Sequence, residues 1–192
     1  MRRNNHSEKD LVKSYLFNIS VSNELLCLPN NSIKWFVFHT KSRREKKIAE
    51  FCYYEDIHFF LPLRKSITYS GKRKHIFYPP LIPGYFFCCI NWEDRYKLYT
   101  TNCIANTIKV KNQERFIQDL SNIKRVLDEG GVLIPVKKYE NGTRVKVNSG
   151  PFMGLEGEII TVKDKNRLVL HIDEIGNAVS LEIDADSIEE VK

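Results

Sequence analysis

The chain has 192 residues, of which 42% are hydrophobic and 11% aromatic, so it is too apolar for a disordered protein and suits one or two small domains. Its net charge of +6 is unevenly distributed: residues 1–139 carry 24 Lys/Arg and 13 Asp/Glu (+11), whereas residues 140–192 carry 6 and 11 (−5). A basic first part and an acidic second part indicate separate partners, and the basic part favours a polyanion. Two solvated faces of unequal charge are the alternative.

The five cysteines are odd in number and show no C-x-x-C spacing, which favours a reducing compartment. At least one of Cys88 and Cys89, inside the apolar run 85–90, is expected to be buried. Arg2 and Arg3 are not followed by the apolar segment of a signal peptide, and no run approaches the length of a membrane span. We therefore expect a cytoplasmic monomer without a membrane segment.

Residues 1–33 lack a sustained hydrophobic period and are expected to form a partly disordered extension. The aromatic and β-branched run 34–39 predicts a buried strand. Ser42 and Glu45 have the spacing of a capping box, which predicts a helix over residues 43–54. Further strands are predicted at 58–63, in two arms within 65–77, at 84–90 and at 104–111, with a short helix at 92–100. This order is typical of an α/β sandwich of the split βαβ type.

Apolar residues at 116, 120, 123 and 127 predict an amphipathic helix that Gly130-Gly131 ends. Residues 129–141 are the expected linker. Five short strand signals follow, at 143–147, 158–162, 168–172, 178–183 and 187–191, with polar turns between them. So many short strands in about fifty residues predict a small β-barrel.

Three motifs together resemble the NusG family of transcription elongation factors. They are WFV at 35–37, PLIPGYFF at 80–87 and GTRVKVNSGPFMGLEG at 142–157, the last matching the family's KOW segment. The resemblance implies an α+β protein: a NusG-type N-terminal domain over 34–128, the linker at 129–141, and a five-stranded SH3-like KOW β-barrel over 142–192. The basic segment 40–47 and the basic hairpin resemble the specialised paralogues, such as polysaccharide-operon antiterminators.

In this family the N-terminal domain binds RNA polymerase through an apolar patch. The resemblance places Trp35, Ile82, Pro83 and Tyr85 in that patch, with Phe87 beneath it. A second polymerase contact would involve Tyr99, Thr100 and Thr101. The alternatives are that Trp35 and Phe87 belong to the core and that residues 99–101 are a solvated helix end.

Clustered cations predict a nucleic-acid contact, because they release counterions from a phosphate backbone. The cluster comprises Lys41, Arg43, Arg44, Lys46, Lys47, Lys72, Arg73, Lys74 and His75. The resemblance directs Lys41, Arg43 and Arg44 at the non-template DNA strand, and Tyr69 and His75 could stack on an unpaired base. Charges that serve only solubility are the alternative.

The KOW domain would recruit a further partner, such as the ribosome or the Rho termination factor, through Phe152 and Ile175. Ile175 and Asn177 stand where the housekeeping factor has an aromatic and a basic residue, which argues against Rho. The acidic charge of this part argues against direct RNA binding. Phe152 as a barrel core residue is the alternative.

Nothing in the sequence indicates catalysis. The five histidines form no H-E-x-x-H motif, and there is neither a P-loop nor a G-x-G-x-x-G motif, so no metal or cofactor is expected. The leading hypothesis is a non-enzymatic elongation factor that binds RNA polymerase and suppresses pausing or termination. The alternative is a ribosome- or RNA-associated KOW protein that grips RNA with its basic domain.

Overall fold

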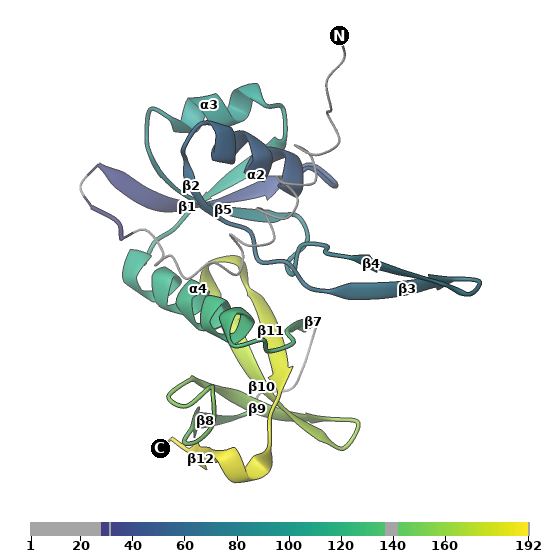
Figure 1. The fold of residues 1–192 in the computed structure, drawn as a ribbon. Helices are drawn as coiled ribbons and strands as arrows, with labels where there is room; N and C mark the ends of the chain where they lie inside the picture. The colour runs from purple at the N-terminus through teal and green to yellow at the C-terminus, as the bar shows by residue number, and fades with distance from the viewer. Residues whose placement is uncertain (1–27, 31, 137–141, 192) are drawn as a thin grey trace. The chain divides into compact units, whose positions relative to one another are not determined.

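The computed structural model describes residues 28–30, 32–136 and 142–191, and its contacts divide the chain into two compact units (Figure 1). Unit 1 is Met1–Gln113 and unit 2 is Glu114–Lys192. Most of the expected N-terminal extension and the second half of the expected linker, residues 137–141, lie outside the described residues.

Unit 1 is built on a four-stranded antiparallel sheet with the order β2-β5-β1-β6. In chain order the elements are β1 (Ile33–Thr40), α2 (Glu45–Tyr54), β2 (His58–Phe60), β3 (Ser66–Ser70), β4 (Arg73–Phe77), β5 (Tyr85–Asn91), α3 (Arg95–Thr100) and β6 (Ile104–Lys109). Because β1 and β2 are both antiparallel to the β5 strand between them, they run parallel to each other. This arrangement confirms the predicted split βαβ sandwich.

The core of unit 1 lies on the sheet face that α2 and α3 cover (Figure 1). Phe36 and Phe38 of β1 and Phe86 of β5 share one cluster with Ile48 of α2 and Leu98 of α3. The alternate strand residues point to the other face, and they too are buried: Trp35, Val37, Phe87 and Cys89. This double burial explains why β1 and β5 are continuous apolar runs. Both Cys88 and Cys89 are buried, as expected.

The predicted capping box is wrong. Helix α2 begins at Glu45 with Arg44 as its N-cap residue, and no side chain caps it. The Glu45 carboxylate instead accepts a hydrogen bond from the backbone N–H of Gly84, at 2.8 Å. Glu45 is buried, so its charge is used to satisfy a backbone donor at the end of the sheet rather than at its own helix.

Unit 2 is helix α4 (Gln113–Asp128, whose first residue belongs to unit 1) and a six-stranded antiparallel sheet in the order β12-β8-β9-β10-β11-β7. The strands are β7 (Ile134–Val136), β8 (Thr143–Val147), β9 (Glu156–Val162), β10 (Lys165–Ile172), β11 (Asn177–Glu182) and β12 (Ile188–Glu190), with short 3₁₀ helices η1 (Asp173–Ile175) and η2 (Ala185–Ser187). The five predicted strands are all present, which confirms an α+β chain with a C-terminal antiparallel β domain.

The boundary between the two units lies after Gln113, whereas the sequence predicts that the first domain extends to residue 128. Helix α4, which the sequence assigns to the first domain (34–128), clusters with the strands of unit 2. The expected linker 129–141 also contains a strand, because β7 pairs with β11 through Val136 opposite Ala178. A run of only three residues interrupted by Pro135 is too short to show a strand period, so the sequence could not reveal this pairing.

A substitution at Gly157 of β9 tests the close approach of β9 to β10. A Cβ atom there would lie 2.3 Å from the backbone oxygen of Val169. This clash could be relieved only by moving the main chain of β9 or β10. We expect Gly157→Ala to lower the free energy of unfolding of unit 2 by about 2 kcal/mol or more, as measured by urea denaturation. The adjacent exposed substitution Glu156→Ala should change it by about 0.5 kcal/mol or less; equal effects would contradict the close approach.

Candidate functional site

The end of the unit 1 sheet where β1 stops and β5 starts gathers most of the predicted site residues. His39 pairs with Tyr85 across these strands, and their rings meet edge to face with centroids 5.4 Å apart. Pro83 is exposed and Tyr85 half-buried, whereas Ile82 is buried. The surface of this end is therefore formed by Pro83, Tyr85 and His39, with Ile82 as support.

Hydrogen bonds hold the turn before β5 from both sides. Gly84 donates its N–H to Glu45, and its carbonyl accepts from the Thr40 N–H at 2.8 Å. Gly84 has a φ of +85°, and a Cβ atom on it would touch the His39 ring at 3.4 Å. A residue with a side chain is thus disfavoured there, and the turn presents Tyr85 in one fixed orientation.

A cationic turn lies beside it, at the end of β1. The Lys41 N–H donates to the Cys103 carbonyl at 2.8 Å, and the Lys41 ammonium bonds to Asn102. The Arg44 N–H closes the turn onto the Lys41 carbonyl at 3.1 Å. Arg43 has a φ of +58°, a left-handed conformation that is uncommon for a residue with a side chain. Arg43 and Arg44 are both exposed in this turn, and the next residue, Glu45, bonds the Gly84 N–H of the neighbouring turn.

The hairpin β3-β4 leaves the same end of the sheet and projects away from it (Figure 1). Its stem is a bridge between Leu63 and Pro80. The predicted cations Lys72, Arg73, Lys74 and His75 are all exposed on it, as are the paired Ile67 and Ile76, and Tyr69 is 71% exposed. An isolated two-stranded hairpin is marginally stable in water, so an exposed apolar pair on it favours a partner.

The other predicted polymerase contacts are placed differently. Trp35 is 1% exposed and sits toward the opposite end of β1, where its backbone N–H and carbonyl are both bonded by the Gln113 amide. The Thr100 and Thr101 hydroxyls donate to carbonyls of α3, those of Lys97 and Leu98. Tyr99 bonds Thr107 through its hydroxyl, at 2.6 Å. The structure thus does not bring Trp35 to the Tyr85 surface, and residues 99–101 serve the end of a helix.

In unit 2, α4 is tied to both loops that carry the predicted partner-binding residues. Near its C-terminal end, Arg125 donates to the Met153 carbonyl at 2.6 Å, one residue after Phe152. Toward its N-terminal end, Asp119 accepts from the Asp173 N–H at 3.3 Å, at the start of the η1 turn that contains Ile175. Phe152 and Ile175 are both half-buried. The helix therefore restrains both loops together.

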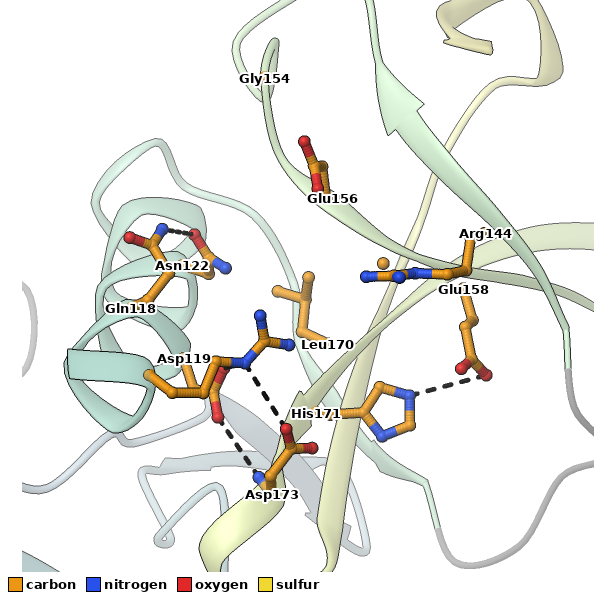
Figure 2. A pocket seen from close by; sticks show the side chains of 12 residues that line it. Gln118, Asp119, Asn122, Arg144, Gly154, Glu156, Glu158, Leu170, His171 and Asp173 are labelled. Atoms are coloured by element: carbon orange, nitrogen blue, oxygen red, sulfur yellow. Dashed lines mark hydrogen bonds and ion pairs between the residues drawn. The ribbon is translucent and has the colours of Figure 1, made fainter. Parts of the chain in front are cut away.

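Between these two attachments lies a polar pocket of about 630 Å³ (Figure 2). Arg115 reaches Asp119 at 3.3 Å and Asp173 at 3.5 Å, and on the strand side of the pocket His171 of β10 lies 3.6 Å from Glu158 of β9. Asp119 is 4% exposed, and this burial raises the pKa of its carboxyl from 3.8 to about 6, against the opposing effects of the Asp173 N–H and Arg115. No motif in the sequence points to Asp119, and its one local signal is a carboxylate between Phe116 and Leu120 on an apolar helix face.

In the part of the chain that the structure describes, no cluster of His, Cys, Asp and Glu side chains is arranged to hold a metal ion. Likewise, none of the described helices has the length and apolar character needed to cross a membrane.

Comparisons with known proteins define the class of this two-unit fold. The family described as transcription termination factor nusG matches residues 33–141, more than half of the chain, and the KOW motif matches residues 141–173. The chain thus combines a NusG N-terminal domain with a KOW segment, the domain plan of a transcription elongation factor. It belongs to the NusG family of transcription termination/antitermination factors.

Individual proteins and a solved structure are similar to this chain over most of their length. The NusG protein of Rickettsia typhi is 27% identical over 187 residues, covering 88% of this chain and 96% of that protein. The NusG protein of Borreliella burgdorferi is 22% identical over 193 residues, with 82% and 98% covered. A solved structure concerning domain interaction in Thermotoga maritima NusG is 17% identical, with a TM-score of 0.49 and 83% and 98% covered.

The raised pKa of Asp119 predicts a pH-dependent stability of unit 2. Between pH 3.8 and about 6 the folded chain holds a proton that the unfolded chain has released, so this stabilising contribution is lost as pH rises through that window. Asp119→Asn keeps an acceptor for Asp173 but cannot ionise. We expect its free energy of unfolding, relative to wild type, to rise by about 1–3 kcal/mol from pH 4 to pH 7 in urea denaturation.

The exposed substitution Asp186→Asn serves as the control for this measurement, because it removes a carboxylate from the same unit without touching α4. A difference for Asp119→Asn that stays constant across the pH range, like that of the control, would contradict the assignment.

Proposed function

We propose that this NusG-family protein binds RNA polymerase through the Tyr85 end of the unit 1 sheet and suppresses pausing and termination. The observation that supports this most is the convergence of the Pro83-Gly84-Tyr85 turn, the cationic turn and the β3-β4 hairpin at that one end. An aromatic ring held by a rigid turn is the type of anchor that protein interfaces use, because little conformational entropy is lost on binding.

Such a factor needs no catalytic group. A protein that contacts two sides of a mobile cleft stabilises the closed state if it binds that state more tightly than the open one. Pro83 and Tyr85 would form the contact, with buried Ile82 shaping the surface from below. We assign Trp35 a packing role in the sheet, and any contact by residues 99–101 rests on the Tyr99 ring, because both threonine hydroxyls are used internally.

The cations at this end would hold an exposed DNA strand. Arg43, Arg44, Lys72, Arg73 and Lys74 are exposed and form no ion pair with the described residues. Their proximity to the Tyr85 surface supports binding of the non-template strand beside the polymerase. The contact would depend strongly on salt and weakly on sequence.

Unit 2 would recruit a second partner through the loops of Phe152 and Ile175. Both side chains are half-buried, so a partner can gain additional contact with them. The acidic charge of this part favours a protein surface such as that of the ribosome, and the isoleucine at 175 disfavours Rho. Because α4 holds both loops, a partner that rearranges either loop must also displace Arg125 or Asp119.

Tyr85→Ala tests the polymerase contact. Removing an anchoring aromatic side chain is expected to weaken the Kd for core RNA polymerase about 10-fold or more and to lower read-through in a purified elongation assay on a terminator template. Tyr54→Ala, at the exposed C-terminal end of α2, is the matched control and should behave as wild type.

Two results would contradict the proposal: equal Kd values for Tyr85→Ala and Tyr54→Ala, or co-purification of nuclease-sensitive ribosomal material in place of polymerase. The second result would support the alternative of an RNA-associated KOW protein. Increased termination in the elongation assay would instead support a role like that of a general termination factor.

Arg43→Gly tests the nucleic-acid contact without damaging the fold. Glycine adopts the left-handed conformation of residue 43 without strain, so the variant should fold at least as well while losing one cation. We expect weaker binding to a DNA strand and a salt-dependence slope reduced by about 1. Lys163→Gly removes a cation from another left-handed, exposed turn, in unit 2, and should leave the slope unchanged. An unchanged slope for Arg43→Gly would contradict the proposal that these cations contact nucleic acid.

A further inference from the structure

The opposite end of the unit 1 sheet contains a second, smaller cavity that the proposed function does not use. Trp35 pairs with Cys89 of β5 on one side, but β6 ends at Lys109, which pairs with Phe36, so on the β6 side no strand lies beside Trp35. The side-chain amide of Gln113 takes the place of that strand, with hydrogen bonds of 2.8 and 2.9 Å to the Trp35 backbone. A pocket of about 230 Å³ remains at this position, within unit 1.

The walls of this pocket are aromatic and its rim is cationic. Trp35, Phe36 and Trp92 line it together with Ile90 and Val110, and Lys34, Lys109 and Ser32 stand around them. Lys34 and Lys109 are exposed, and neither ammonium has an acidic partner among the described residues. The volume is below the range of about 300–1,000 Å³ for sites of drug-sized ligands, and it suits a single planar ring system.

Trp92 is an exposed aromatic side chain that its surroundings hold in place. It is 57% exposed, and the Arg95 guanidinium lies over its ring with the Cζ atom 3.4 Å from the centroid. Phe36 lies against it with centroids 6.4 Å apart. Arg95 covers one face of the indole and is not among the residues that line the pocket. The part of the ring that lines the pocket is therefore available to a ligand.

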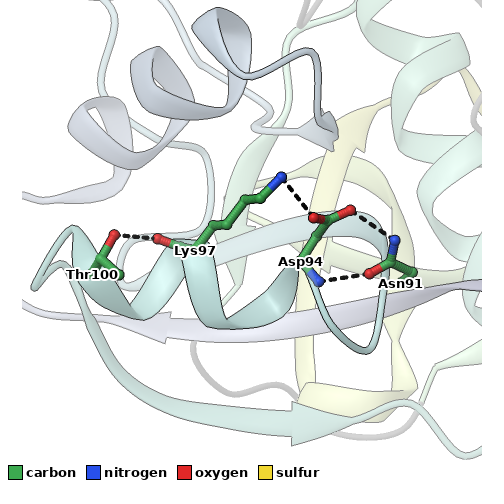
Figure 3. A network of polar contacts seen from close by, with 4 residues as sticks. All are labelled: Asn91, Asp94, Lys97 and Thr100. Atoms are coloured by element: carbon green, nitrogen blue, oxygen red, sulfur yellow. Dashed lines mark hydrogen bonds and ion pairs between the residues drawn. The ribbon is translucent and has the colours of Figure 1, made fainter.

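The turn that carries Trp92 is also fixed, as Figure 3 shows. Asn91 and Asp94 exchange two hydrogen bonds, of 2.7 and 2.6 Å, across Trp92. The Lys97 ammonium contacts Asp94 at 2.7 Å and lowers the pKa of that carboxyl. The Asp94 carboxylate is therefore already paired with Lys97 and Asn91 and does not neutralise Lys34 or Lys109.

We propose that this pocket is a second nucleic-acid site, in which an unpaired base of a single strand stacks on Trp92 while Lys34 and Lys109 contact the flanking phosphates. A stacking ring next to uncompensated cations is the combination that single-strand-binding surfaces use. The two lysines favour this ligand over an apolar peptide, which would bury their charges without a partner. A duplex keeps its bases stacked inside and cannot enter.

The site is distinct from the cationic turn and the hairpin. The register of β1 with β5 puts Ile33 opposite Asn91 at the pocket end and His39 opposite Tyr85 at the other. A strand of nucleic acid could therefore contact either end independently, and the two ends can be tested separately.

The test uses the full-length chain and fluorescein-labelled 12-nucleotide oligo(U) and oligo(dT), with duplex DNA of equal length as a third probe. Trp92→Ala should weaken the Kd for a single strand about 5- to 50-fold and leave duplex binding unchanged. Trp92→Phe keeps a stacking ring and should recover most of the affinity. Tyr96→Ala is the matched control, because Tyr96 is 62% exposed in helix α3, which follows that turn, but does not line the pocket.

Tryptophan fluorescence gives an independent readout, since the chain has only two tryptophans and Trp35 is buried. Stacking on Trp92 should quench the wild-type signal more than that of Trp92→Phe, whose remaining tryptophan, Trp35, is buried. Weakening with oligo(U) alone, with oligo(dT) alone or with both supports the site and identifies the strand it accepts. Equal Kd values for Trp92→Ala and Tyr96→Ala, or no quenching at saturating oligonucleotide, overturn it. Arg43→Gly should leave the quenching at saturation unchanged, which separates this site from the Tyr85 end.

Discussion

The antiparallel pairing of β1 with β5 is the constraint on which the rest of unit 1 depends. Seven residues of β1 pair in register with β5, from Ile33 with Asn91 to His39 with Tyr85. Because both strands are buried on both faces, a slip of one residue would exchange the Phe36 and Trp35 faces and destroy both cores. The register thereby brings the end of β1 and the start of β5 together and places the Trp92 turn at the far end.

A buried charged side chain stabilises the Tyr85 end of the sheet. Glu45 is a buried carboxylate, and its hydrogen bond to Gly84 joins the first turn of α2 to the turn before β5. A short loop with a left-handed residue, Arg43, connects β1 to that helix. The surface is therefore rigid where it presents Pro83 and Tyr85. The two-stranded hairpin extends it outward, and the paired Ile67 and Ile76 on that hairpin stay exposed.

Unit 2 shows a different balance, in which polar contacts join a helix to a sheet. Asp119 and Arg115 hold the η1 turn, and Arg125 holds the loop of Phe152. The cost of burying Asp119 appears as its raised pKa, so the folded unit loses stability as the carboxyl ionises, although the Asp173 N–H and Arg115 both favour the ionised form. The two loops expected to receive a partner are thus coupled to the state of one helix, and through it to each other.

The sequence by itself determined the family, the order of the elements and nearly every strand, because hydrophobic period, turn residues and the PLIPGYFF and KOW motifs are local signals. It also identified the residues 41–44, 72–75 and 83–85 as surface candidates. Only the tertiary structure decided that Trp35 is interior, that Glu45 bonds Gly84 rather than capping its helix, that α4 and β7 join the second unit, and that Trp92 borders a pocket. Each of these depends on contacts between residues distant in the chain, and a local pattern does not encode which buried or exposed partner a side chain meets.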